Sequence, residues 1–269
     1  MSKGRLLIDG DVLVYRAGFA AEKTKYLVAA TDGRHTLADT SVDAKAIAAK
    51  REGGATIWSR KDPAPIETAL TIVDVMIADI RAHYAGMDTA VFLSGVGNFR
   101  YGVATRATYK GNRDAPKPIH SKALVAHLMK RGAEVSAGEE ADDLLGIHAT
   151  ASPGSVIASV DKDLMQIPGK HYNFVTKEEV TVSPKEAAFS FYAQVLSGDP
   201  VDNVPGLTGI GPGKARAALA ECDSPRACWG KVLRLYTDEF AGQGERFALE
   251  AARLVYVRKK VNETWQPPK

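Results

Sequence analysis

Eight acidic residues in four clusters are the part of this sequence best suited to chemistry. Each cluster follows an apolar run or stands at the start of an expected helix: Asp9; Glu140, Asp142 and Asp143; Asp161 and Asp163; Asp199 and Asp202. Like charges repel, so a fold that gathers them needs bound cations or shifted pKa values. Hard divalent ions prefer carboxylate oxygens, and Mg²⁺ is the first candidate. Any one pair could be a solvated charge or a helix cap, but four clusters favour a metal site.

The elements that must position these acids are alternating strands and helices. Strands are expected at 5–9, 89–93, 133–136 and 155–161, helices at about 63–80, 119–131 and 139–150, and a hairpin at 171–182. This order predicts an α/β fold with a mainly parallel sheet flanked by helices. Ligands of such sheets bind at the carboxyl ends of the strands, where Asp9 and Asp161 stand. Glu140 and Asp143 share a helix face that could point to the same edge, while Asp142 points partly away.

The remaining segments depart from that pattern. Residues 20–62 hold a polar turn, a helical stretch near 43–51 and a Gly-Gly break, and they predict no clear fold. Residues 94–118 are polar and basic, which predicts a long loop or an exposed, partly helical excursion. From a capping box at 183–186 onward, helices are expected at about 184–197, 212–222, 225–239 and 244–259. A domain boundary is therefore expected near residue 183, dividing the chain into 1–182 and 183–269.

A glycine-rich run, Gly-Leu-Thr-Gly-Ile-Gly-Pro-Gly-Lys-Ala, occupies residues 206–215. Such a turn at a helix start offers backbone N–H groups and a positive dipole end to a phosphate. A dinucleotide-binding loop would follow a strand, whereas this run follows helix and loop. The pattern favours a helix-hairpin that grips a DNA backbone without reading bases, with a plain helix turn as the alternative. The candidate contacts are Gly209, Gly211, Gly213, Lys214 and Arg216.

Basic and aromatic residues alternate in the excursion at 99–113. The candidate contacts are Arg100, Arg106, Tyr109, Lys110 and Arg113. Interleaved aromatic and basic side chains suit a single strand, because bases stack on the rings and phosphates pair with the cations. Taken alone, the same pattern also fits a solvated charged loop.

Composition narrows the function classes. The net charge is +3 although eight acids are assigned to a metal site, so the remaining surface is basic, which favours a nucleic-acid partner. No apolar stretch reaches membrane-spanning length and no signal peptide is expected. Cys222 and Cys228 fit neither a zinc pattern nor a disulfide framework, which predicts a cytoplasmic protein. The six histidines are scattered without ligand spacing.

The motifs, taken in order, resemble the 5′-nuclease (flap endonuclease) family, which includes bacteriophage 5′–3′ exonucleases and the 5′-nuclease domain of bacterial DNA polymerase I. The resemblance rests on Ile8-Asp9-Gly10, Tyr109-Lys110-Gly111-Asn112-Arg113, Glu140-Ala141-Asp142-Asp143, Asp161-Lys162-Asp163 and the run from Gly198 to Gly211. It implies a PIN-like core with a helix–three-turn–helix DNA clamp at about 184–222. It also implies metal-dependent hydrolysis of DNA phosphodiesters near 5′ ends.

The resemblance further implies a role for each site residue. A first metal would be held by Asp9, Glu140, Asp142 and Asp161, and a second by Asp163, Asp199 and Asp202, with Asp143 in support of Asp142. Lys110 and Arg113 would touch the scissile phosphate as catalytic residues together with Asp161. The expected ions are two Mg²⁺, with Mn²⁺ as an alternative, and K⁺ at the helix–three-turn–helix. The expected substrate is DNA with a 5′ flap, nick or free 5′ end, and RNA in RNA–DNA hybrids is a further candidate. A monomer without membrane contact is expected.

One position departs from the family pattern. Family members carry an Asp just after the strand that precedes the basic excursion, where this chain has Ser94 and Gly95. Ser94 could hold a metal-bound water, or Asp11 could compensate from the neighbouring strand end. Two alternatives therefore stay open: a structure-specific DNA-binding protein with a weakened metal site, and a PIN-type ribonuclease. The helix-hairpin argues against the ribonuclease, because that element grips duplex.

Overall fold

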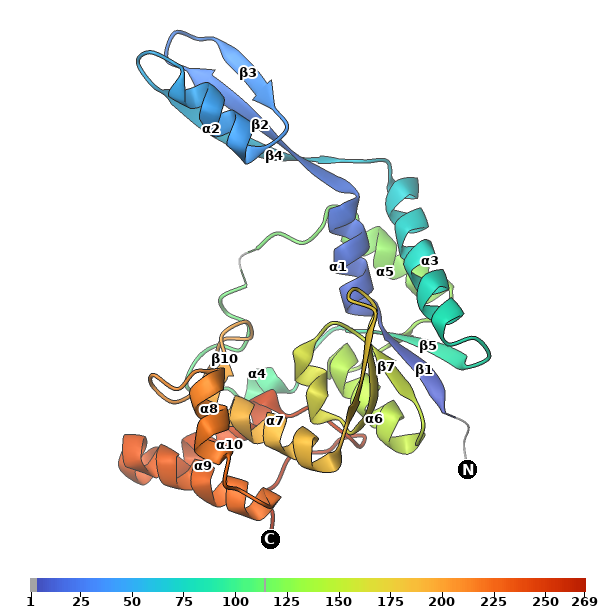
Figure 1. Cartoon of the computed structure of the whole chain (residues 1–269), viewed down its shortest axis with the longest axis vertical. Helices are drawn as coiled ribbons and strands as arrows, with labels where there is room; N and C mark the ends of the chain where they lie inside the picture. Colours follow the sequence, from blue (N-terminus) through green and yellow to red (C-terminus); the bar gives the residue numbers. More distant parts are fainter. Residues whose placement is uncertain (1–3, 114) are drawn as a thin grey trace. The chain divides into compact units, whose positions relative to one another are not determined.

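The computed structural model describes residues 4–113 and 115–269, and the contacts divide the chain into two compact units. The first unit comprises Met1–Val12, Ile80–Ala115 and Leu128–Lys269, and the second comprises Leu13–Asp79 and Pro116–His127. Three helices have residues in both units: α1 (Gly10–Ala20), α3 (Ile66–His83) and α5 (Ser121–Lys130) (Figure 1). Among the described helices, none combines the length and apolar character needed to cross a bilayer.

The first unit is built on a six-stranded sheet in the order β6-β5-β1-β7-β8-β9. Its strands are β1 (Arg5–Asp9), β5 (Asp88–Leu93), β6 (Glu134–Val135), β7 (Val156–Ala158), β8 (Gly169–Asn173) and β9 (Glu178–Val182). All neighbouring pairs are parallel except β8 and β9, which form the expected hairpin. β1 occupies a central position because its run Leu6-Leu7-Ile8 is fully buried, as strands covered on both faces require. The predicted mainly parallel α/β fold is confirmed.

Helix α6 (Ala141–Ala151) packs against β1, β5 and β7. Leu145 of this helix lies in a buried cluster with Leu7, Phe92 and Ile157 from the three strands. The strand expected over 155–161 is shorter, because the chain leaves the ladder after Ala158 and forms a 3₁₀ turn, η1 (Lys162–Gln166). The start of α6 and the ends of β1 and β7 therefore share one edge of the sheet.

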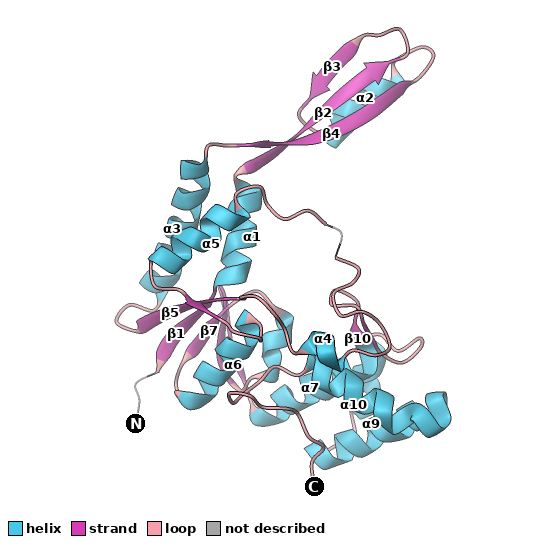
Figure 2. Ribbon diagram, turned by 180° about the vertical axis from the view of Figure 1, so that it is seen from behind, coloured by secondary structure: helices cyan, strands magenta, loops and turns pink. Residues whose placement is uncertain are grey.

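The rest of the first unit is mostly helical, with α4 (Arg100–Val103), α7 (Pro184–Ser197), α8 (Pro212–Leu219), α9 (Pro225–Phe240), η2 (Ala241–Gln243) and α10 (Gly244–Val255) (Figure 2). Two short strands, β10 (Gly198–Asp199) and β11 (Val204–Pro205), pair between α7 and α8. A large core cluster joins α7, α9 and α10 around Val195, Val232 and Tyr236. The domain boundary expected near residue 183 falls within the first unit. The division of the chain into 1–182 and 183–269 stays a prediction.

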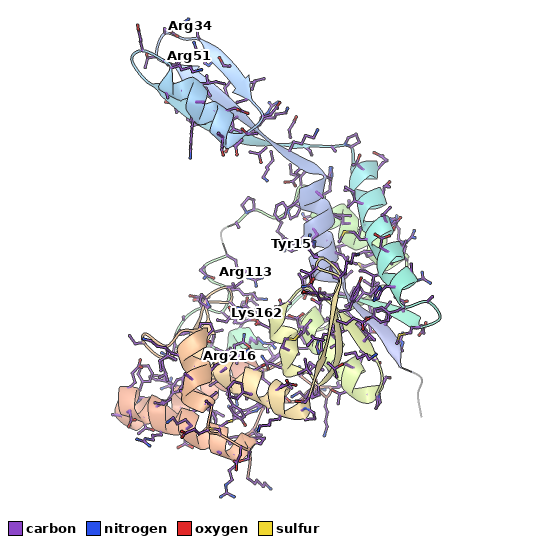
Figure 3. All side chains as sticks on the ribbon, in the orientation of Figure 1. Tyr15, Arg34, Arg51, Arg113, Lys162 and Arg216 are labelled. Carbon is purple, nitrogen blue, oxygen red and sulfur yellow. The ribbon has the colours of Figure 1, made fainter. Side chains whose placement is uncertain are left out.

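Residues 20–62, unclear from the sequence, form a separate small sheet in the second unit. β2 (Glu22–Ala30) pairs antiparallel with β3 (His35–Ala38) and with β4 (Ala55–Pro63). The helix α2 (Ser41–Ala49) covers one face of this sheet, where Val28, Ala38 and Ala44 are buried together. Arg34 and Arg51 lie at the end of the sheet formed by the β2–β3 turn and the α2–β4 loop (Figure 3).

Candidate metal and nucleic-acid site

The carboxyl ends of β1 and β7 bring the first acids together. Asp9 is only 2% exposed, and its Oδ2 accepts a hydrogen bond from the Ser159 hydroxyl at 2.6 Å. The same Ser159 oxygen accepts the Asp161 N–H at 3.0 Å. Asp161 in turn begins η1, where its Oδ1 accepts the Asp163 N–H at 2.8 Å. Ser159 thus links the acid of β1 to the pair of acids that follows β7.

The start of α6 adds three more acids with different surroundings. Asp143 is fully buried, and its carboxylate binds both terminal nitrogens of Arg100, at 2.7 and 2.9 Å. It also accepts the backbone N–H groups of Glu140 at 3.1 Å and Arg258 at 3.0 Å. Because its oxygens are engaged within the chain, these contacts agree with the supporting role expected for Asp143. Its inclusion among the metal ligands stays a prediction.

Burial, and after it mutual repulsion, raises the pKa values of three acids at this edge. Burial raises the pKa of Asp9 to about 6 against the hydrogen bonds that it accepts, and the charge of Asp161 adds to the rise. Burial, followed by the charges of Asp9 and Asp161, raises the pKa of Asp142 well above its usual range. The pKa of Asp163 rises to about 7, first through burial and then through Asp161. A bound cation would lower all three pKa values by compensating the charge.

The segment of the Tyr-Lys-Gly-Asn-Arg motif lies against two of the predicted metal ligands. The Tyr109 oxygen lies 2.7 Å from a carboxylate oxygen of Glu140 and 2.5 Å from one of Asp202, and its single hydroxyl proton can be donated to either. Lys110 pairs with Glu140 and, at 3.6 Å, with Asp202, while Arg113 pairs with Asp202. The Lys110 N–H also donates to the Asp202 carbonyl at 2.8 Å. The motif and the acids therefore form one ion-paired cluster.

As the described side chains lie, no three histidines, cysteines, aspartates or glutamates form a group that could hold a metal ion. Glu140 and Asp202 are instead bound by cations of the chain itself. The donor set is still the one that a hard divalent ion prefers, since it consists of carboxylate oxygens. Burial raises the pKa values of Asp9, Asp142 and Asp163, and the charges of neighbouring acids add to each rise. The residues therefore fit a divalent ion in their chemistry.

Ser94, at the position that departs from the family pattern, is hydrogen-bonded to Asp11, the acid expected to compensate. Asp11 accepts the Ser94 N–H through Oδ1 at 3.1 Å and Oδ2 at 3.3 Å, so its carboxylate lies at the end of β5. The Ser94 hydroxyl accepts the Ala141 N–H at 2.9 Å and so satisfies a backbone group at the start of α6. The charge of Asp11 raises the pKa values of Asp9 and Asp142. Asp11 is thus a ninth acid at this edge, and its spacing of two from Asp9 was the available signal.

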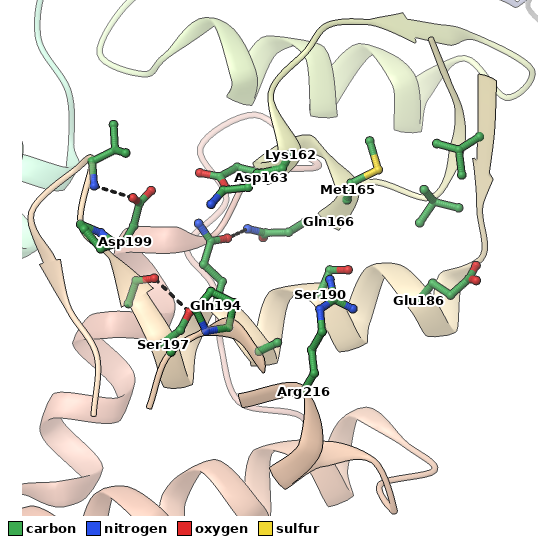
Figure 4. Close-up of a pocket in the computed structure, with 18 of the residues that line it drawn as sticks. Lys162, Asp163, Met165, Gln166, Glu186, Ser190, Gln194, Ser197, Asp199 and Arg216 are labelled. Atoms are coloured by element: carbon green, nitrogen blue, oxygen red, sulfur yellow. Dashed lines mark hydrogen bonds between the residues drawn. The ribbon is translucent and has the colours of Figure 1, made fainter. Parts of the chain in front are cut away.

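A groove connects the second group of acids to the glycine-rich run. Its volume is about 590 Å³, and its lining includes Lys162, Asp163, Asp199, Gly211 and Arg216 (Figure 4). The groove is bounded on one side by α7, whose Gln194 accepts a hydrogen bond from Gln166 at 2.7 Å. A phosphodiester backbone that follows the groove would therefore pass from the acids to the start of α8.

The glycine-rich run exposes its backbone. Gly209 has a positive φ of 69°, and a Cβ atom at Gly209, Gly211 or Gly213 would have no neighbour within 4 Å. Lys214 and Arg216 are exposed at the start of α8, and Lys214 donates to the Gly209 carbonyl at 2.9 Å. The predicted contacts are thus accessible to a ligand, as a helix-hairpin that binds a backbone requires.

Three predicted DNA contacts are engaged within the chain, and one of them, Tyr109, is 3% exposed with its ring in the core cluster of the helices. Arg100 is 3% exposed and, besides Asp143, donates to the carbonyls of Leu254 at 2.9 Å and Tyr256 at 2.7 Å. Arg106 donates to the Pro205 carbonyl at 2.9 Å and stacks on the rings of two phenylalanines. These contacts favour structural roles for both arginines over the predicted contact with DNA. The sequence showed only the charge of these arginines. Their hydrogen-bond acceptors include backbone carbonyls of residues far away in the chain.

The chain was compared with protein-family models, with curated proteins and with solved structures. No protein-family model matches the chain. DNA polymerase I of Rhizobium leguminosarum is 32% identical over 133 residues, which is 42% of this chain and 13% of that protein. DNA polymerase I of Pseudomonas aeruginosa is 31% identical over 169 residues, which is 54% of this chain and 18% of that protein. The chain thus spans less than a fifth of the length of these curated relatives.

Among solved structures, a T5 protein co-crystallised with metal ions superposes with a TM-score of 0.60 at 16% identity, covering 94% of this chain and 89% of that one. T5 5′-exonuclease with bound zinc superposes with a TM-score of 0.55 at 17% identity, with the same coverage of both chains. These likenesses show the fold, and the expected PIN-like core is confirmed. With the polymerase relatives, they confirm the predicted resemblance to the 5′-nuclease family.

Proposed function

We propose that this chain is a structure-specific 5′-nuclease, acting as a 5′–3′ exonuclease or flap endonuclease on DNA with a 5′ flap, nick or free 5′ end. The observation that carries the proposal is the cluster in which Lys110 and Arg113 meet the acids at the sheet edge. In such a cluster the carboxylates can bind metal ions, and Lys110 and Arg113 can pair with a phosphate of the substrate. The names of the relatives, DNA polymerase I and T5 5′-exonuclease, support the same activity.

The proposed division of the acids follows the two sides of the site. Asp9, Glu140, Asp142 and Asp161 would hold one divalent ion, and Asp163, Asp199 and Asp202 a second, with Mg²⁺ as the expected ion and Mn²⁺ as its substitute. Two such ions supply an activated water and stabilise charge on the attacking and leaving oxygens of the phosphate. A K⁺ ion at the helix–three-turn–helix, activity on RNA in RNA–DNA hybrids, a monomeric state and a cytoplasmic location complete the proposal.

The chain's own residues would orient the substrate. Lys110 and Arg113 now neutralise Glu140 and Asp202, and they would exchange these partners for the scissile phosphate when ions occupy the acids. The groove lined by Asp163, Asp199 and Arg216 would guide the backbone to the glycine-rich run. Asp143 and Arg100 would hold the start of α6 in position through their buried ion pair.

A cleavage assay separates this proposal from its alternatives. A labelled 5′-flap DNA is incubated with the chain and Mg²⁺, with EDTA in a parallel reaction and single-stranded RNA as a second substrate. The proposal expects Mg²⁺-dependent release of a 5′ fragment from the DNA. Binding of the flap without any cleavage would indicate a DNA-binding protein, and cleavage of the RNA alone would indicate a ribonuclease.

Asp11→Asn should weaken metal binding without harming the metal-free fold. The amide oxygen can still accept the Ser94 N–H, but the charge that raises the pKa values of Asp9 and Asp142 disappears. We expect Mg²⁺ affinity to fall about tenfold, or ~1.4 kcal/mol, and the metal-free melting temperature to stay level or rise. The measurement is the melting temperature as a function of Mg²⁺ concentration. Asp238→Asn, at an exposed pair on α9, is the control, and an unchanged Mg²⁺ dependence in Asp11→Asn would exclude Asp11 from the site.

Lys214→Ala should weaken binding to every duplex sequence alike. Removing one cation that pairs with a phosphate flattens the plot of log K against log salt by about 0.9 for duplex DNA, so the slope should fall by roughly one unit. The measurement is the affinity for a flap substrate at several salt concentrations in EDTA. Lys185→Ala, an exposed lysine outside the groove lining, is the matched control. An unchanged slope would leave the glycine-rich run as an ordinary helix turn.

A further inference from the structure

The small sheet of the second unit has a face opposite α2 that carries large exposed side chains. Leu27 in the central strand lies directly opposite Leu37 of β3 and Trp58 of β4. Directly opposed residues share a face, so these three side chains form one row across the sheet. Leu37 is 67% exposed and Trp58 is 62% exposed. Contiguous apolar side chains at a surface, unlike scattered single ones, mark an interaction site, and this row places three such side chains in line.

Cations occupy the neighbouring rows of the same face. Lys25 lies opposite Arg60, and Lys23 lies opposite Asp62, and the period of two places all of them on the side of Leu27. Lys25 pairs with Asp39, and Arg60 lies 3.9 Å from Asp62. The carboxylates of both pairs, Asp39 and Asp62, are exposed, and ion pairs at the surface contribute little free energy. An incoming phosphate could therefore exchange for either carboxylate at small cost.

We propose that this face binds single-stranded nucleic acid. Trp58 would stack on a base beside the apolar surface of Leu27 and Leu37, and Lys23, Lys25 and Arg60 would pair with the phosphates on either side. This proposal rests on the proposed nuclease function, because the bound strand would be the single-stranded arm of the DNA substrate. The cations of Lys23, Lys25 and Arg60 lie at the surface beside the exposed apolar row. The face therefore complements a strand that carries both phosphates and bases.

Association of two copies through this face is less favoured by the same residues. Two apposed copies would bring the cations of Lys23, Lys25 and Arg60 together, and like charges at an interface are destabilising. The apolar row contains three side chains, whereas a standard interface buries about 800 Å² on each partner. Binding of a single nucleic acid strand requires less surface, because an aromatic ring for a base and a few cations for the phosphates are enough.

The chain provides its own probe for the test. Trp58 is the exposed member of three tryptophans, since Trp229 and Trp265 are 6% and 9% exposed. Titration with oligothymidylate in EDTA should therefore quench the tryptophan emission as bases stack on Trp58. Trp58→Ala should abolish the quench and weaken binding about 5- to 150-fold, while Trp58→Phe should retain most of the affinity. Arg60→Ala should flatten the salt slope for the single strand by about 0.7.

Matched controls lie on α2, the helix that covers the opposite face. Val42→Ala and Lys45→Ala change an exposed apolar and an exposed basic residue there, and both should bind the oligonucleotide normally. The proposal is overturned if Trp58→Ala and Arg60→Ala bind like the wild-type chain, or if wild-type emission does not respond to the oligonucleotide. It is also overturned if sedimentation shows a dimer that Trp58→Ala dissociates. The readout in EDTA needs no cleavage, so failure of the nuclease proposal in the flap assay would be seen separately.

Discussion

Asp161→Asn should lower the rate of flap cleavage by at least about 100-fold and leave DNA binding nearly unchanged. The amide oxygen can still accept the Asp163 N–H that begins η1, so the local fold should persist. The charge that a divalent ion needs is lost, and metal ions supply several kcal/mol of transition-state stabilisation at such sites. The measurement is a single-turnover cleavage rate at saturating Mg²⁺ together with affinity in EDTA.

The control for this substitution is Asp238→Asn, which removes an equal charge from an exposed pair on α9. It should cleave at the wild-type rate. Since Asp161 also contributes to the raised pKa values of Asp9 and Asp163, the metal-free variant should be no less stable than the wild type. Cleavage by Asp161→Asn at close to the wild-type rate would contradict the assignment of the acids to two metal ions.

Lys110→Ala should reduce the cleavage step more than it reduces affinity. Removal of one group that stabilises developing charge costs roughly 2.7–4 kcal/mol in well-studied enzymes, or about 10²- to 10³-fold in rate. Lys110 is half-buried and burial lowers its pKa, although the charge of Asp202 opposes the shift. The measurement is the single-turnover rate with all of the flap substrate bound.

The same substitution also removes the cation that now neutralises Glu140. The metal-free Lys110→Ala chain should therefore be less stable, and added Mg²⁺ should restore more stability to it than to the wild type. Lys185→Ala, whose side chain is exposed on α7, should show neither effect. If affinity falls but the bound complex cleaves normally, Lys110 only holds the strand.

The parts of the fold that the sequence predicted are those with a continuous buried run. Leu6 to Ile8 and Val156 to Ala158 are apolar because both faces of their strands are covered. The small sheet at 20–62 was not predicted, because β4 has no buried residue and β2 buries only Val28 and Ala30, so neither strand has a regular alternation of buried and exposed residues. The register of the sheet depends on pairing between β2 and β4, which are far apart in the sequence. A pattern within either strand does not predict this pairing.

The candidate site was predictable to the level of strand ends. The positions of Asp9 and Asp161 followed from the rule that sites form at carboxyl ends of strands. The link through Ser159 and the reach of Asp11 to Ser94 depend on side-chain directions across neighbouring strands. The burial of Arg100 was hidden for the same reason, since a basic residue in a polar segment predicts a solvated charge. Which of the acids bind metal stays a prediction.

The buried contacts of Arg100 have a consequence for when the proposed site can form during synthesis of the chain. Arg100 holds Asp143 from a position 43 residues away and the carbonyls of Leu254 and Tyr256 from 154 and 156 residues away. The N–H of Arg258 completes the surroundings of the same carboxylate. A ribosome must therefore release residues up to about 258 before the start of α6 can be fixed. We infer that a nascent chain that ends between Asp202 and Arg258 carries all eight acids without the contacts that fix the start of α6.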